Sequence, residues 1–563
     1  NNIYEARIYK NKANDEISKG NFYKAIEYAE KSIQIHSDYP AQEPIELAEI
    51  YETIGYLHAE SGDFTKSLGF LEQSSKIIQS LEKSSVNFSQ NQLRSIKASI
   101  NRTRFCSSVI LRDWEMASQL ADNFVEDNLQ NLKKQFSHYG RKEKLDVTSN
   151  KRIRSYFPYA TPTKMAQYIL RTKGIVLDSI IEDEDFYKAS QNSRIRDLIK
   201  KRDSLERALH IVQSDPKLLA TKEKGIRSEL GLVSERLAEE NYNKQYKALT
   251  ITLSQIQRKL PANSVLVEFI EYPTFNADDG FSWDEEKYGA VILFPNTKSD
   301  SNDSNIQPVR IFFENEKDIK KHLNELLTWS GDSDKTFPKH ALPELYRLVA
   351  KPIIDQLPEN IDSLILSPDG ILNFLPFSAL HENPGSPFLA EQFNLFQVSS
   401  GRDLLDEFET FHSKTITLFG NPEYKKALPS PQREQNLLAM QMEDNEHFRN
   451  LSLAPLPGTA EEVAMLLNLV DGSYQTTAHL GPEATEENLR QVQNPGILHL
   501  ATHGFFIESP DKIKSNSGQS RFFGLSSSQE SELSNPMRRA GLALAGAQNT
   551  FDAWAENKSP ISE

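Results

Sequence analysis

The sequence has 563 residues, more than a single hydrophobic core usually serves, so we expect two or three domains. Its formal net charge of −15 argues against a general nucleic-acid-binding protein, because contacts to phosphate need clustered lysines and arginines. No apolar run approaches the roughly 18 residues that span a bilayer, and the first residues lack the basic start and apolar core of a signal peptide. A single cysteine excludes a disulfide framework and a thiolate zinc site. These features indicate a protein of the reducing cytoplasm, without membrane or direct nucleic-acid partners.

Residues 1–150 are expected to form helical repeats. Residues 20–25 recur in similar form at 62–67, and each copy begins with a glycine. The pattern is similar to the tetratricopeptide (TPR) helix–turn–helix, in which small residues let paired helices approach closely; a weaker third copy centres on residues 113–117. An unrelated helical bundle is the alternative. Stacked repeats of this kind form concave surfaces that bind proteins or peptides, which predicts an activating protein or peptide as a partner.

Residues 151–259 keep a helical pattern of a different character. Two runs of apolar residues at three–four spacing are separated by Pro216 and the two polar residues before it, and proline ends or kinks a helix. This arrangement predicts an antiparallel helical hairpin, partly coiled-coil-like; two ordinary amphipathic helices packed on a neighbour are the alternative. The runs consist of Ile195, Leu198, Leu205, Leu209 and Val212, then Ile226, Leu230, Val233 and Leu237.

After Pro261, short apolar runs alternate with helical patterns, which predicts an α/β domain over residues 260–563. We expect helices at 342–357 and 463–470, the second opened by a capping box at 459–462. Residues 509–536 are rich in Ser, Asn, Gln and Glu, a composition typical of a mobile loop. The expected strands are 264–270, 288–294, 309–313, 363–367, 395–399, 415–420, 496–502 and 541–547.

The candidate site lies where one expected strand ends in His503 and Gly504. Reactive groups gather at the carboxyl ends of strands in open α/β sheets, and a histidine there can act as a general base near neutral pH. Gly504 would let its backbone N–H approach an oxyanion with no side chain in the way. A purely structural histidine is the alternative. A metal site shared with His499 lacks an HExxH pattern and a carboxylate partner, so we expect neither a metal nor a cofactor.

Five ordered motifs within residues 260–550 resemble the bacterial CHAT domain, a caspase-like peptidase family often fused to TPR repeats. They lie at residues 364–380, 418–422, 456–463, 499–506 and 539–547. The resemblance implies an α + α/β fold, with TPR-like repeats and a helical hairpin followed by a caspase-like α/β domain. It also implies that His503 is the catalytic histidine and that the Gly504 amide helps to form the oxyanion hole.

The resemblance further implies a cysteine nucleophile after the next core strand, in a Ser-Ala-Cys type motif that this sequence lacks. Its one cysteine, Cys106, lies in a helical pattern of the repeat region and is expected to be a buried, inert packing thiol. No G-x-S-x-G elbow offers a serine instead. Three explanations stay open: the chain is a portion of a longer protein, a maturation cut leaves the cysteine on a second chain, or the protein is a pseudo-enzyme. The missing initiator Met and the family-like His503 segment favour the first two.

The resemblance implies a bacterial caspase-like cysteine endopeptidase that is regulated through its repeats and cleaves another protein in a defence or cell-death pathway. The chain as given is expected to be inactive until a cysteine-bearing segment completes the site. Residues 509–536 are either a gate beside the histidine or a surface insertion. The competing hypothesis is a non-catalytic scaffold that uses the repeats and the α/β domain for assembly alone.

Overall fold

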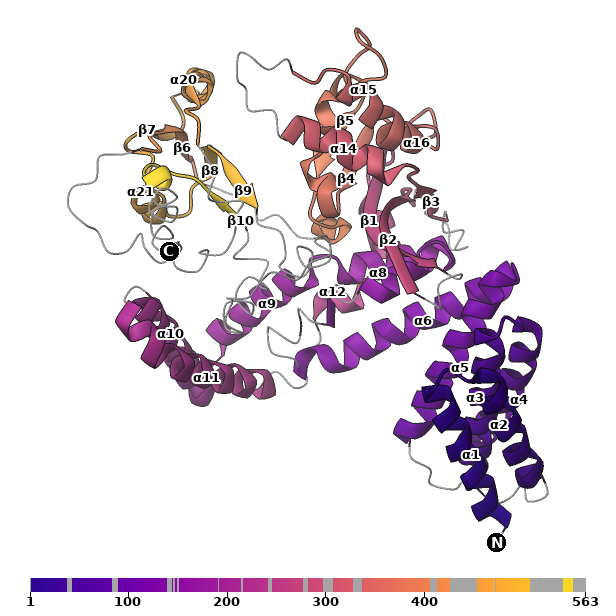
Figure 1. Cartoon of the computed structure of the whole chain (residues 1–563). Coiled ribbons are helices and arrows are strands. Elements are labelled where there is room, and N and C mark those ends of the chain that lie inside the picture. Colours follow the sequence, from indigo (N-terminus) through magenta and orange to yellow (C-terminus); the bar gives the residue numbers. More distant parts are fainter. Residues whose placement is uncertain are drawn as a thin grey trace, which may run out of the picture. The chain divides into compact units, whose positions relative to one another are not determined.

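The chain forms two compact units in the computed structural model, and Figure 1 labels their helices and strands. The first comprises Asn1–Ser137, Asp146–Glu182 and Asn243–Asp406, and the second His138–Leu145, Asp183–Tyr242 and Glu407–Glu563. Among the helices in the described part of the chain, none combines the length and the apolar character needed to cross a membrane. The structure describes residues 2–37, 43–83, 90–138, 144, 147–148, 151–190, 192–213, 216–240, 246–276, 282–296, 307–327, 337–405, 413–425, 453–470, 472–506 and 540–549.

The N-terminal region consists of three helical hairpins, consistent with the expected TPR-like repeats. In each hairpin one residue of the turn adopts a left-handed conformation: Gly20 at φ 74°, Gly62 at φ 81° and Arg112 at φ 58°. The weak third copy is therefore a hairpin too, although an arginine replaces the glycine that tolerates this conformation best. The helices are α1 (Asn2–Ser18), α2 (Phe22–Ser37), α3 (Pro44–Glu60), α4 (Phe64–Lys83), α5 (Gln90–Ile110) and α6 (Trp114–Gln135).

Equivalent small residues join the helices of the first two hairpins. Ser32 Oγ donates to the Ala6 carbonyl at 2.7 Å, and Ser74 Oγ donates to the Ala48 carbonyl at 2.6 Å, with the same separation along the chain. In the second hairpin a Cβ added to Gly55 would lie 2.6 Å from Leu71 Cδ2, so only glycine allows this approach. The repeats thus keep their register through hydroxyl groups as well as apolar contacts.

Further helical elements follow the repeats. Helices α10 and α11 form the predicted antiparallel hairpin, with Ile195, Leu198, Val233 and Leu237 buried between them. The predicted core residues Leu209 and Val212 lie outside the residues whose side chains the structure describes. The elements are a 3₁₀ turn (Lys151–Tyr156), α8 (Pro162–Thr172), α9 (Ile175–Ala189), α10 (Ser193–Gln213), α11 (Pro216–Glu240), α12 (Lys247–Thr250) and α13 (Leu253–Lys259).

The first unit contains a five-stranded mixed sheet in the order β3-β2-β1-β4-β5. Strand β1 pairs antiparallel with β2 and parallel with β4, and its alternate residues enter two cores. Val265 and Val267 face the core shared with α14 and α15, whereas Leu266 and Ile270 face the core shared with α5, α6, α8 and α13. The strands are β1 (Ser264–Asn276), β2 (Ser282–Leu293), β3 (Val309–Phe312), β4 (Ser363–Ser367) and β5 (Asn394–Gln397).

The helical segment after β3 departs from the prediction. The expected helix 342–357 is interrupted by a π-helical turn, and Pro352, two residues after this turn, has no N–H to give to a carbonyl of the preceding turn. The elements are α14 (Glu316–Leu327), α15 (Ala341–Leu345), the π-helical turn (Tyr346–Ala350), α16 (Lys351–Ile354) and, after β4, α17 (Leu389–Gln392). The expected three-part division at residues 150 and 259 stays a prediction.

The second unit contains a three-stranded parallel sheet in the order β7-β6-β8, and a two-stranded antiparallel pair, β9 and β10. Val463 of α20 packs on Ile416 and Leu418 of β6. The elements are β6 (Thr415–Pro422), α20 (Pro457–Leu469), β7 (Gln475–Gly481), α21 (Glu486–Gln491), β8 (Ile497–Ala501), β9 (Gly504–Phe506) and β10 (Ala540–Leu542).

Two sequence predictions in this unit are wrong. Helix α20 begins two residues earlier than the expected capping box, and Thr459 lies inside the helix, where its hydroxyl donates to the Leu456 carbonyl and accepts from the Asn421 N–H. The expected strand 541–547 ends at Leu542, because the chain then turns into a short helical segment. Strands β7 and β9 were not expected at all.

Candidate active site

His503 lies directly beyond the carboxyl end of β8, as the sequence predicted. Strand β8 pairs in parallel with the central strand β6, so that Ala501, the last residue of β8, lies opposite Gly420, two residues before β6 ends. Three segments meet beyond these ends: Thr502 and His503 after β8, Tyr424 after β6, and Ala543 after β10. The imidazole of His503 is half-buried at this edge of the sheet.

A chain of hydrogen bonds with a defined direction holds the backbone of His503. Thr502 Oγ1 donates to the Ala543 carbonyl, which can only accept, so the 3.0 Å contact between Tyr424 Oη and Thr502 Oγ1 has the tyrosine as donor. The lone pair of Tyr424 Oη then accepts from the His503 N–H at 3.4 Å. The Ala543 N–H in turn donates to the His503 carbonyl at 2.8 Å. Both backbone groups of His503 are therefore fixed by neighbouring segments.

The imidazole itself has a backbone partner. His503 Nε2 lies 2.8 Å from the Ala454 carbonyl oxygen, and because a carbonyl cannot donate, Nε2 carries the proton and Nδ1 carries the lone pair of the neutral ring. The segment that contains Ala454 is held in turn, since Gln548 Oε1 accepts from the Leu453 N–H at 2.7 Å. The ring of Tyr424 packs 5.3 Å from that of His503, centroid to centroid. The geometry thus selects Nδ1 as the proton acceptor.

Gly504 follows as the first residue of β9 and is exposed. A Cβ added there would find nothing nearer than Leu542 Cδ2 at 3.8 Å, so the described neighbours do not themselves require a glycine. Space beside this backbone is consistent with the approach of a carbonyl oxygen, but the role of Gly504 in an oxyanion hole stays a prediction. Residues 509–536, the expected gate or surface insertion, lie outside the described residues.

The two histidines of the expected strand are directed to different partners. His499 Nε2 lies 3.1 Å from Glu462 Oε1 of α20, in an orientation that makes no hydrogen bond, while His503 Nε2 donates to a carbonyl. His499 does therefore have a nearby carboxylate, which the sequence analysis did not find. His503 does not take part in that contact, and the pair does not form a shared site.

Cys106 does not have the properties of a nucleophile. It lies in α5 with 3% of its surface exposed, in a core that includes Phe105 and Ala121. This burial raises the pKa of the Cys106 thiol to about 12, so the thiolate that attacks a carbonyl does not form near neutral pH. The expectation of a buried packing thiol is confirmed.

The sequence analysis missed the residues that orient His503. Tyr424 and Ala454 precede the histidine by 79 and 49 residues, and no spacing rule connects them to it. A backbone carbonyl leaves no signal in side-chain identity, so Ala454 could not have been found. Tyr424 stands four residues after the expected strand 415–420, and a polar aromatic residue beyond a strand end is a weak signal that could have marked it.

Comparison with known families gives one match. The family model described as the CHAT domain matches residues 339–559, which include Tyr424, Ala454, His503 and Gly504 but not Cys106. The match covers less than half of the chain, and it begins after β1, β2 and β3 of the five-stranded sheet. No curated protein matches the chain.

Proposed function

From the premise that this chain carries a CHAT domain over residues 339–559, we propose that it is the histidine-bearing part of a caspase-like cysteine endopeptidase. The observation that carries the proposal is the hydrogen bond from His503 Nε2 to the Ala454 carbonyl, which leaves Nδ1 as a base at the end of a parallel strand.

In the proposed reaction the nucleophile is a cysteine outside these 563 residues, because Cys106 is buried and protonated. Nδ1 of His503 takes the thiol proton, and the resulting thiolate sulfur attacks the peptide carbonyl carbon to form a tetrahedral intermediate. The imidazolium then gives the proton to the leaving amine as the C–N bond breaks. Water repeats the sequence on the thioester, releasing the acid and restoring the thiol.

The surrounding groups assist each step of this proposal. The Ala454 carbonyl accepts from Nε2–H throughout and stabilises the positive charge that appears on the ring. Tyr424 is a positioning residue, since it holds the His503 backbone without reaching Nδ1. Gly504 would supply a backbone N–H to the oxyanion, the kind of donor whose removal costs about 10²–10³ in rate in other enzymes.

We further propose that the helical hairpins of α1–α6 bind an activating protein or peptide, and that the cleaved substrate is another protein in a defence or cell-death pathway. Stacked helical hairpins generally present extended concave surfaces, which supports the first part. The regulatory pathway rests on family resemblance alone. A separate chain that carries the cysteine is one form that the completed enzyme could take.

The alternative function is a non-catalytic assembly protein. Its supporting observation is that the one cysteine in the sequence is inert. The two functions differ in whether the His503 ring matters. A scaffold would keep its partners when His503 is replaced, whereas a peptidase would lose its cleavage products.

The test compares wild-type protein with His503→Ala and His499→Ala, each combined with the proposed cysteine-bearing segment. His499 is the matched control because it stands four residues earlier in β8 and its ring contacts Glu462 instead. The proteins are incubated with a cell lysate, and newly formed peptide N-termini are counted by mass spectrometry. We expect cuts from wild type and His499→Ala and none from His503→Ala. Equal numbers in all three samples would contradict the proposal and favour the scaffold.

A further inference from the structure

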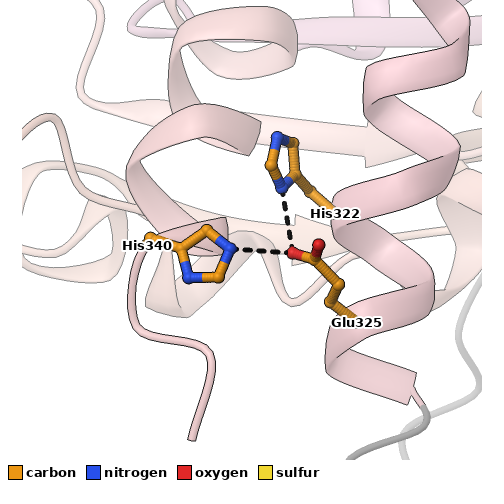
Figure 2. Close-up of side chains that lie close together, drawn as sticks. All are labelled: His322, Glu325 and His340. Atoms are coloured by element: carbon orange, nitrogen blue, oxygen red, sulfur yellow. Dashed lines mark hydrogen bonds and ion pairs between the residues drawn. The ribbon is translucent and has the colours of Figure 1, made fainter.

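A cluster of two imidazoles and one carboxylate lies in the first unit, on elements separate from the strand ends that carry His503. His322 and Glu325 come from the same face of α14, one turn apart, and His340 is the residue just before α15 (Figure 2). His322 Nδ1 lies 3.1 Å and His340 Nε2 lies 2.9 Å from the same oxygen, Glu325 Oε2. Figure 2 shows the two rings approaching that oxygen from different sides.

We propose that His322, Glu325 and His340 bind a divalent transition-metal ion, with zinc the ion that this set of ligands fits best. Two imidazole nitrogens and one carboxylate oxygen are a ligand set that proteins use for zinc, and such three-ligand sites keep a fourth position for water or another ligand. Among the described residues, no other group of three or more His, Cys, Asp or Glu brings its ligand atoms as close together.

The distances between the three ligand atoms would change little when zinc binds. The three ligand atoms lie within 4.8 Å of one another. Zinc–nitrogen and zinc–oxygen bonds of about 2.0–2.2 Å in a tetrahedron place neighbouring ligand atoms about 3.4 Å apart. The two nitrogen–oxygen distances would therefore lengthen by a few tenths of an ångström, while an ion replaces the two ring protons now directed at Oε2.

The surroundings can make this adjustment. The His322 side chain is 11% exposed, and its neighbour Leu323 is fully buried in the core beneath the sheet, so α14 holds this ligand in place. The His340 side chain is 64% exposed and can rotate toward an ion. One rigid and one adjustable imidazole allow binding without a change in the backbone.

The electrostatics favour a cation. Glu325 contributes one negative charge to the centre, whereas Glu344 of α15 is paired with Arg347 at 2.8 Å. The Glu325 carboxylate offsets part of the charge of a divalent ion. Solvent can reach the fourth position because His340 is exposed.

Bound zinc would join α14 to the start of α15 and so stiffen the covering of one face of the five-stranded sheet. His322 and Glu325 precede the segment matched by the CHAT family, and His340 is its second residue. The site would therefore connect the matched segment to the strands and helix that precede it. This role is independent of His503 and does not rest on peptide cleavage.

The competing explanation is a hydrogen-bonded triad without a metal, in which both rings donate to Glu325. The test separates the two. The full chain is stripped of metal with EDTA, dialysed and titrated with zinc chloride by calorimetry. In a parallel sample cobalt(II) is added as a spectroscopic probe, because its visible absorption reports the number of ligands and their geometry. Variants are His340→Ala and Glu325→Gln; His381→Ala is the control, since His381 belongs to the same unit and bonds to the Ala379 carbonyl instead.

We expect one zinc ion per chain in the wild type and in His381→Ala. Affinity should fall at least tenfold in His340→Ala and Glu325→Gln, with loss of the intense visible band of tetrahedral cobalt. Circular dichroism of each variant confirms that it is folded, and the exposure of His340 makes its removal compatible with folding. Absence of zinc binding in the wild type, or equal affinity in wild type and both variants, would overturn the proposal in favour of the hydrogen-bonded triad.

Discussion

Replacing Lys173 with methionine removes an ammonium group that is surrounded by oxygen atoms in the first unit. Lys173 Nζ lies 3.0 Å from Glu268 Oε2, 3.2 Å from the Phe269 carbonyl and 2.7 Å from Ser367 Oγ. Glu268 is fully buried and Lys173 is 9% exposed, so the pair lies out of water. The other carboxylate oxygen of Glu268 accepts from the Gly401 N–H at 2.6 Å. The pair therefore connects the end of α8 with β1, β4 and the turn after β5.

The expected loss of unfolding free energy depends on which charged group each substitution leaves buried without its partner. Lys173→Met leaves a buried carboxylate with one N–H donor, and breaking a buried pair in this way typically costs about 3–5 kcal/mol of unfolding free energy. Glu268→Gln leaves the ammonium with the Phe269 and Ser367 oxygens, so we expect a smaller loss. The double variant removes both charges, and its loss should be less than the sum of the two single losses.

Hydrogen exchange measured by mass spectrometry on peptides from β1 and β4 is the suitable assay, because it reports the stability of this unit without assuming that the whole chain unfolds in one step. Lys351→Met is the control, since Lys351 forms an exposed pair with Asp355 and should change little. If Lys173→Met exchanged no faster than this control, or if the double variant lost the full sum, the assignment of Lys173 and Glu268 as a coupled buried pair would be wrong.

Three further predictions concern the repeats. Gly55→Ala should destabilise the packing of α3 on α4 by about 1–3 kcal/mol, because the new Cβ would lie 2.6 Å from Leu71. Adding Leu71→Ala should relieve part of this loss. Unchanged hydrogen exchange in Gly55→Ala would refute the close contact. Cys106 should resist alkylation by iodoacetamide at pH 8 and react after denaturation, since burial raises the pKa of its thiol to about 12; rapid labelling of folded protein would contradict this. Burial lowers the pKa of His36 and His58, so below about pH 6.5 the unfolded chain binds more protons than the folded chain. The repeats should therefore lose stability as the pH falls through and below that value. Urea unfolding followed by helix circular dichroism at pH 7.5 and 5.5 checks this, and equal unfolding midpoints would argue against it.

Much of the α/β region could be predicted because its strands are apolar runs flanked by turn residues. Strand β4 has the expected bounds, and the parallel pairing of β6 with β8 places His503 at a carboxyl end as anticipated. Strand β7 was missed because its sequence is mostly polar and exposed, so it has neither a continuous apolar run nor a clear alternation. The capping-box pattern at Thr459 was misleading because its hydroxyl bonds to Leu456 and to Asn421 of the neighbouring strand, a tertiary contact.

The site was predicted only in part for a similar reason. A histidine before a glycine at a strand end can be read from sequence, but the choice between Nδ1 and Nε2 depends on Ala454, whose contribution is a backbone carbonyl. The three-residue cluster of Figure 2 was not predicted from the sequence, for another reason. His322 and Glu325 show helical spacing, yet His340 comes from a separate segment, and only the fold brings it to the same carboxylate oxygen.

The central claim is that Nδ1 of His503 is the base of a cysteine peptidase. The most direct measurement is the single-turnover cleavage rate of one identified substrate by this chain combined with the proposed cysteine-bearing segment, and by the His503→Ala and His499→Ala variants of that combination. We predict a loss of about 10²–10⁴-fold in His503→Ala, the usual contribution of a positioned general base, and a rate close to wild type in His499→Ala. A His503→Ala rate equal to that of wild type would contradict the account.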